Sequence, residues 1–175
     1  MKKALLIASV LFIAVISTAC INNIAVQELN NKAAEYMQKG DYESAINRLQ
    51  ASIDLDSTMY ETYYNLGIAA TNAKKYDMAI EAFEDGMKIN PDYTGFYYSL
   101  AIAQSEKADE ILENEDISFE DRKSAVKTKQ EAMLNLKKYL NIEQNADDAD
   151  EIKELISEIE TFINESAKFD INTTK

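Results

Sequence analysis

A 34-residue period in side-chain character runs through the middle of this chain, from about Ala25 to Leu100. Shifting the sequence by one period aligns Tyr42 with Tyr76 and also aligns a set of apolar and small residues. The other pairs are Ala45 with Ala79, Ile46 with Ile80, Leu49 with Phe83, Ile53 with Met87 and Leu55 with Ile89. A fixed period of this length is typical of a solenoid, in which each supersecondary unit packs only on its neighbours. Because such arrays usually hold other molecules, the period favours a binding protein over a catalyst.

The composition favours helices and excludes several kinds of catalytic site. One proline and four glycines among 175 residues argue for long helices joined by short turns. Histidine is absent and cysteine occurs once, which excludes Ser-His and Cys-His catalysis and zinc sites built from these residues. The net charge of −13 argues against nucleic acid as a partner, because phosphate binding requires Lys and Arg. We therefore expect an all-α protein that is not an enzyme and holds no cofactor or metal.

The first twenty residues have the pattern of an export signal. Lys2 and Lys3 are basic, residues 4–16 are almost entirely apolar, and residues 17–19 are small and precede Cys20. The apolar segment 4–19 is shorter than the ~20 residues that a membrane-spanning helix needs. The segment therefore favours a cleaved signal peptide over a permanent transmembrane anchor.

The position of Cys20 directly after these small residues resembles a bacterial lipoprotein signal, although Ser17 stands where such signals favour Leu. The resemblance implies a signal peptide over residues 1–19, acylation of Cys20 and a short tether over residues 20–25. More than one acyl chain makes membrane attachment effectively permanent. By analogy with envelope sorting, the absence of Asp after Cys20 favours the outer membrane over the inner one. Two alternatives stay open: a soluble exported protein with a free thiol, and an uncleaved anchor.

Each repeat is predicted to form two antiparallel helices. In the second repeat, helices over residues 60–72 and 76–89 are separated by a turn at Lys74-Lys75. Asn90-Pro91-Asp92 follows, where Pro cannot continue the helix and Asp can cap the next one. In the first repeat the turn is Gly40-Asp41, because Gly tolerates the left-handed conformation and Asp caps the helix that follows.

These features resemble the tetratricopeptide repeat (TPR) family. Its pattern is met in the second repeat by Tyr63, Leu66, Gly67, Ala79, Phe83 and Pro91. The first repeat matches more weakly, through Leu29, Ala33, Tyr36, Ala45, Leu49 and Ser52. The resemblance implies an all-α helical-hairpin solenoid over residues 26–166. Its three repeats would cover about residues 26–59, 60–93 and 94–146.

The third repeat is longer than the other two. The counterpart of Ala79 is Ala132, which comes 19 residues late, and apolar spacing continues on both sides of Ser118 and Asp121, a pair that resembles a capping box. We therefore predict that both helices are extended by nine or ten residues and project ~14 Å beyond the solenoid. An apolar stripe from Ile152 to Ile163 predicts a capping helix over residues 148–166 that seals the open end of the stack. Residues 167–175 are expected to fray.

In TPR proteins the first helices of the repeats line a concave groove. The resemblance places seven side chains of the expected binding site there: Asn30, Met37, Tyr64, Ile68, Asn72, Tyr98 and Ile102. Their apolar and hydroxyl-bearing surface suits a helix or an extended peptide. Alternatively, the long hairpin or the last helix covers them. Replacing Tyr64 and Tyr98 together by alanine is predicted to abolish partner capture and to leave the fold nearly unchanged.

Ile117 and Phe119, at the tip of the long hairpin, are a second candidate contact surface. The acidic stretches at residues 113–121 and 147–151 lack the Gly and the spaced oxygen ligands of an EF-hand loop, so no metal site is predicted. One TPR subfamily clamps the C-terminal carboxylate of chaperone peptides. At its clamp positions this chain has Asn30, Ala34, Asn65, Gly95 and Ser99, of which Asn65 alone fits.

The function predicted from these features is a membrane-tethered adaptor of the bacterial envelope. It would capture an unidentified envelope protein or peptide in the groove or on the long hairpin, and would bind the membrane through its lipid. Alternatives are a surface-exposed lipoprotein that contacts a host or the environment, and an enzyme. The oligomeric state stays open.

Overall fold

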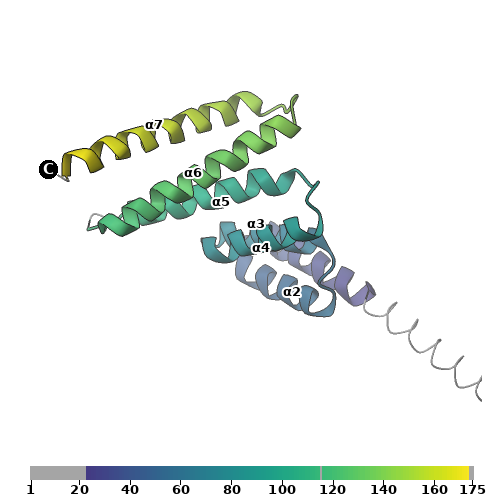
Figure 1. Ribbon diagram of the computed structural model, residues 1–175. Coiled ribbons are helices and arrows are strands. Elements are labelled where there is room, and N and C mark those ends of the chain that lie inside the picture. The colour runs from purple at the N-terminus through teal and green to yellow at the C-terminus, as the bar shows by residue number, and fades with distance from the viewer. Residues whose placement is uncertain (1–22, 115, 174–175) are drawn as a thin grey trace, which may run out of the picture.

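The structure, a computed structural model, describes residues 23–114 and 116–173, and every regular element within these stretches is a helix. A first helix covers residues 23–38. It is followed by α2 (Tyr42–Leu55), α3 (Tyr60–Asn72), α4 (Tyr76–Ile89), α5 (Gly95–Leu112), α6 (Phe119–Ile142) and α7 (Ala149–Thr173). Successive helices pack into stacked hairpins (Figure 1), so the predicted helical-hairpin solenoid is confirmed.

The predicted signal segment and Cys20 lie outside the described residues. Among the helices of the described stretches, none combines the length and the apolar character that crossing a membrane requires.

The turns within the first two hairpins follow the repeat. Gly40 has φ of 74°, and Lys74, one period later, also has a positive φ, of 58°. The Asp41 side chain caps α2 by accepting a hydrogen bond from the Ser44 amide at 3.1 Å. The prediction for this turn is therefore confirmed. The prediction that Asp92 caps the next helix is wrong, because α5 begins later and has Thr94 at its N-cap.

The N-terminal core joins the first two hairpins to the start of α5. Phe83 and Phe96 are fully buried, and Leu49 lies with them among small alanine side chains. Gly67 lets α3 approach the Phe83 ring, since a Cβ atom at this position would lie 2.3 Å from Phe83 Cε1. A small residue at this position, as the TPR pattern has, is therefore a packing requirement.

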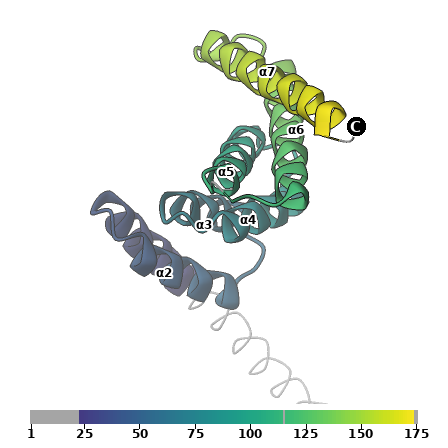
Figure 2. The same cartoon turned by 90° about the vertical axis from the view of Figure 1, so that its left-hand side faces the viewer.

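The C-terminal core forms where α5, α6 and α7 meet. Its buried members are Ala101, Ala132, Leu136, Ile152, Ile156 and Ile159. The helix α7 packs on α6 and covers the end of the stack, as the first helix of a further repeat would (Figure 2). Its backbone is helical to Thr173, through residues that we expected to fray. No Gly or Pro follows Ala149 to end the helix earlier.

The third hairpin is longer than the other two, but its two helices are extended by different lengths. The helix α6 has 24 residues against 14 in α4, so its predicted extension of nine or ten residues is confirmed. The helix α5 has 18 residues against 13 in α3, an extension of five, so the prediction was wrong for this helix. Polar and mostly acidic residues 113–116 follow Leu112, and carboxylates are unfavourable at the negative end of a helix. The hairpin projects beyond α3 and α4 (Figure 1).

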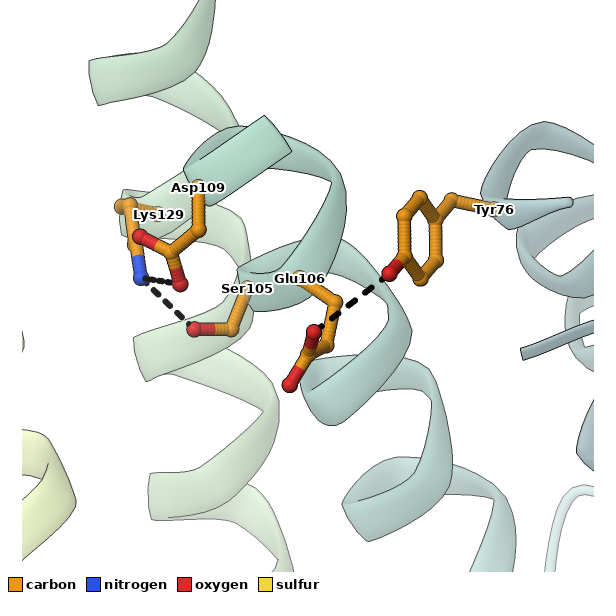
Figure 3. Close-up of polar contacts among 5 residues, drawn as sticks. All are labelled: Tyr76, Ser105, Glu106, Asp109 and Lys129. Carbon is orange, nitrogen blue, oxygen red and sulfur yellow. Dashed lines mark hydrogen bonds and ion pairs between the residues drawn. The ribbon is translucent and has the colours of Figure 1, made fainter. Parts of the chain in front are cut away.

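Polar contacts fix the long hairpin internally and to the second repeat (Figure 3). Lys129 on α6 is 8% exposed, and its Nζ donates to Ser105 Oγ at 2.8 Å and to Asp109 Oδ2 at 2.7 Å. On the neighbouring side of α5, the Tyr76 hydroxyl of α4 donates to Glu106 at 3.4 Å. Burial raises the pKa of Tyr76, and the Glu106 carboxylate raises it further. Because all three helices share these contacts, the hairpin has a defined position on the solenoid.

Candidate functional site

Asn30, the first predicted groove residue, lies in a polar junction between the first two repeats. Its Nδ2 donates to Ser52 Oγ at 3.0 Å and to Thr62 Oγ1 at 3.1 Å, and Ser52 and Thr62 are fully buried. The Oδ1 atom is buried and has no hydrogen-bond partner among the described residues. The Asn30 Nδ2 atom therefore joins one repeat to the next and is not directed toward a ligand.

The equivalent junction one repeat later is aromatic. One period after Asn30, Ser52 and Thr62, the chain has Tyr64, Gly86 and Phe96. The Tyr64 ring centroid lies 5.6 Å from that of Phe96, 5.1 Å from Tyr93 and 5.9 Å from Phe83. Gly86 makes room for this arrangement, because a Cβ atom there would lie 2.3 Å from Phe96 Cζ. Edge-to-face ring pairs of this kind stabilise packing beyond the area that they bury.

Tyr98, the next member of the series, packs against the C-terminal core, and its ring centroid lies 5.6 Å from that of Tyr139. Alanine at both Tyr64 and Tyr98 would therefore remove a packed ring from each core. The prediction that this double substitution leaves the fold nearly unchanged is untested, and these ring contacts make some loss of stability the expected result. Loss of partner capture in such a variant would not distinguish a binding defect from unfolding.

Three tyrosines at the second junction form what we call the aromatic patch: Tyr60, Tyr64 and Tyr93, all half-buried. Ser99 Oγ donates to the Tyr64 hydroxyl at 3.3 Å. Burial raises the pKa of Tyr93, and its contact with Tyr64 raises it further, so the phenol stays neutral. The sequence analysis did not predict Tyr60 and Tyr93 as site residues, although each lies three residues before another aromatic residue.

The remaining groove positions differ in accessibility. Met37 and Ile68 are half-buried and pack against the N-terminal core. Ile102 is half-buried and lies outside both cores, and Asn72 is exposed, with its Nδ2 donating to the Ile68 carbonyl at 2.8 Å. Since α3 and α5 are in contact, Ile68 and Ile102 occupy equivalent places on adjacent helices. Of these four residues Asn72 is the most exposed, and it lies with the half-buried Ile68 and Ile102 on α3 and α5.

The hairpin-tip residues Ile117 and Phe119 lie at the start of α6. Ile117 is half-buried and Phe119 is 51% exposed. Ser118 between them caps α6, since its Oγ accepts a hydrogen bond from the Asp121 amide at 3.1 Å, as the capping-box pattern predicted. The tip therefore exposes the apolar Phe119 side chain to solvent at the capped N-terminus of α6.

The chemistry offered by these surfaces is that of binding. In residues 23–114 and 116–173, no group of three or more His, Cys, Asp or Glu side chains is placed to hold a metal ion. The groove combines apolar and aromatic side chains with amides and hydroxyls. Such a surface can bury apolar side chains of a partner and satisfy its backbone hydrogen bonds.

Comparison with known families identifies two repeats. Residues 33–70 match the family described as TPR repeat, and residues 60–93 match that described as Tetratricopeptide repeat. TPR repeats are therefore present, and the fold is a TPR helical solenoid.

Curated relatives share parts of this array. The chain is 31% identical over 62 residues to small glutamine-rich tetratricopeptide repeat-containing protein 2 of Mycosarcoma maydis. The aligned region covers 35% of this chain and 18% of the relative. The chain is also 28% identical over 98 residues to the TPR repeat-containing protein MJ1428 of Methanocaldococcus jannaschii. That alignment covers 49% of this chain and 17% of the relative. The chain thus spans less than a quarter of the length of these relatives.

Two solved structures show the same fold at low identity. The second TPR domain of human RPAP3, in complex with an HSP70 peptide, has a TM-score of 0.63 and 15% identity, covering 79% of this chain and 98% of the domain. The Yersinia enterocolitica type III secretion chaperone SycD, in complex with a peptide of the translocator YopD, has a TM-score of 0.59 and 20% identity, covering 81% and 93%.

Proposed function

We propose that this protein is a membrane-tethered adaptor of the bacterial cell envelope that captures a peptide or a partner protein in its TPR groove. The observation that carries the proposal is the partly exposed surface of the adjacent helices α3 and α5, which bears Tyr64 of the aromatic patch, Ile68 and Ile102. The RPAP3 and SycD structures each contain a bound peptide, which supports binding as the use of such an array. The TPR fold typically serves as an interaction scaffold, which argues against the enzyme alternative.

The groove favours an internal, apolar segment over a C-terminal carboxylate. None of the five clamp positions holds a cationic residue. At three of them the residue already contacts other parts of the protein. Asn30 is bonded at the first junction, Ser99 is 6% exposed and donates to Tyr64, and the Tyr93 ring lies against Gly95. A carboxylate in this groove would lose water without gaining a charged partner. We therefore place apolar side chains of the partner on the aromatic patch.

Site-specific photo-crosslinking tests the groove. We expect a photoreactive phenylalanine analogue at Asn72 or Ile102 to form a discrete adduct with a partner in the native host. The same analogue at Ser157, an exposed position on α7, serves as a control and is expected to form none. Equal adducts from all three positions would indicate non-specific contact and would contradict the groove assignment. The analogue is also placed at Ile117, and adducts formed from this position but not from Asn72 or Ile102 would move the binding surface to the hairpin tip.

Acylation of Cys20 tethers the adaptor in this proposal. We expect mass spectrometry of membrane-purified protein to show a chain that starts at Cys20 with added acyl groups. The Cys20→Ala variant is expected to lack this species, because alanine has no thiol to acylate. An unmodified N-terminal Cys20 would instead support soluble export. Protease treatment of intact cells tests the surface-exposed alternative.

A further inference from the structure

Two hollows lie on the outer side of the solenoid, between the second helices of adjacent repeats. The first hollow lies between α2 and α4 over α3 and has a volume of about 440 Å³. The second lies between α4 and α6 over α5 and has a volume of about 560 Å³. Ile53 and Leu66 of the first hollow correspond to Met87 and Leu100 of the second. The repeat geometry itself therefore builds both hollows.

The first hollow and the groove use different sides of α3. Tyr63 and Leu66 face the hollow, whereas Tyr64 contacts the rings of the aromatic patch. Successive residues on a helix are about 100° apart, so neighbours such as Tyr63 and Tyr64 point in different directions. A ligand in the hollow would therefore leave the groove accessible.

The two hollows share a shape but differ in charge. Among the described residues, Asp54, Glu81 and Asp85 line the first hollow with no lysine or arginine, whereas the second hollow is lined by Glu84, Glu131 and Lys88. Asp85 forms a salt bridge with Lys88 at 2.7 Å. The larger negative charge of the first rim is thus a property of this sequence and not of the fold, and Asp54 and Glu81 have no salt-bridge partner in residues 23–114 and 116–173.

The floor between these carboxylates is apolar. Ile53, Tyr63 and Met78 are half-buried and Leu66 is buried. Burial raises the pKa of Tyr63, and the Asp85 charge raises it further, so its phenol stays a neutral hydrogen-bond donor. Lysine and arginine bury their methylene stems on apolar surface while their charged ends stay at its rim. The Tyr63 ring and the carboxylates favour a cation at that rim.

We propose that the first hollow docks a segment of a partner protein that presents a lysine or arginine between apolar side chains. The stem of the basic side chain would lie on the floor, and its cation would be shared by Asp54 and Glu81. An exposed ion pair alone contributes little, so the apolar contacts and the charge must act together. The adaptor would then hold two segments at once, a neutral one in the groove and a basic one on the outer face.

The full chain, solubilised in a nonionic detergent, can be tested against displayed short peptides. The peptides have a central arginine or glutamine, with random Ala, Leu, Ile and Phe on either side. The test variant is Asp54→Asn with Glu81→Gln. The matched control is Glu84→Gln with Glu131→Gln, which removes two carboxylates from the second hollow and leaves the same net charge. All four positions are partly or fully exposed, so both variants should fold.

We expect arginine peptides to be enriched over glutamine peptides by the unaltered chain and by the control. The test variant is expected to bind the selected arginine peptide about tenfold more weakly, equivalent to about 1.4 kcal/mol. Equal weakening in both variants would show attraction to net charge alone and would overturn the proposal. Equal enrichment of glutamine peptides, or no enrichment of any peptide, would overturn it as well.

Discussion

Replacing Phe96 by alanine is expected to lower the free energy of unfolding by about 3–5 kcal/mol. The Phe96 side chain is fully buried at the junction of the second and third repeats. Its ring centroid lies 5.3 Å from that of Tyr93, 5.6 Å from Tyr64, 6.2 Å from Tyr60 and 6.3 Å from Phe83. Alanine would remove all of these contacts and leave a cavity that the surrounding helices cannot close completely, because those rings pack on one another as well.

Urea unfolding followed by circular dichroism measures this loss, and Phe119→Ala is the matched control. Phe119 is 51% exposed at the hairpin tip, so its removal is expected to cost less than about 1 kcal/mol. A similar loss in both variants would contradict the assignment of Phe96 to the core. Because Tyr60, Tyr64 and Tyr93 form the aromatic patch on the same cluster, the Phe96 variant should also weaken capture at the groove.

The features that recur with the 34-residue period could be predicted from the sequence. The period aligns Gly40 with Lys74, and both have a positive φ in equivalent turns. It also aligns Ile89 with Ile142 once the 19 extra residues are allowed for, and α4 and α6 end at these residues. Such positions are determined by contacts within one repeat or between neighbouring repeats, which every repeat shares. A sequence comparison within the chain is sufficient to find them.

The junctions could not be predicted in this way, because their character changes from one repeat to the next. Asn30 and Tyr64 occupy the same repeat position, which the family resemblance assigns to the groove. Their side chains contact residues 22 to 32 positions later in the chain, Ser52 for Asn30 and Phe96 for Tyr64. Whether such a side chain reaches a ligand depends on the size of these distant partners. The length of α5 was overestimated for another reason, since the apolar spacing that ends at Leu112 was extended into the polar and mostly acidic residues 113–116.

Replacing Leu136 by alanine is expected to destabilise the C-terminal part of the solenoid by about 2–5 kcal/mol. Leu136 is fully buried on α6 and belongs to the core that it forms with Ala101 of α5 and Ile152, Ile156 and Ile159 of α7. In repeat arrays stability is approximately the sum of repeat and nearest-neighbour terms. The loss should therefore concentrate in α6 and α7 and only weakly affect α2, α3 and α4.

Hydrogen exchange resolved along the chain measures this distribution. We expect amides of α6 and α7 to lose protection in the Leu136→Ala variant, while those of α3 and α4 keep most of theirs. Leu134→Ala is the matched control on the same helix, since Leu134 is 62% exposed and its removal leaves the core intact. A uniform loss of protection from the first helix to α7 would show that the stack unfolds as one unit. In that case the capping helix would stabilise the distant groove surface as well as the end that it covers.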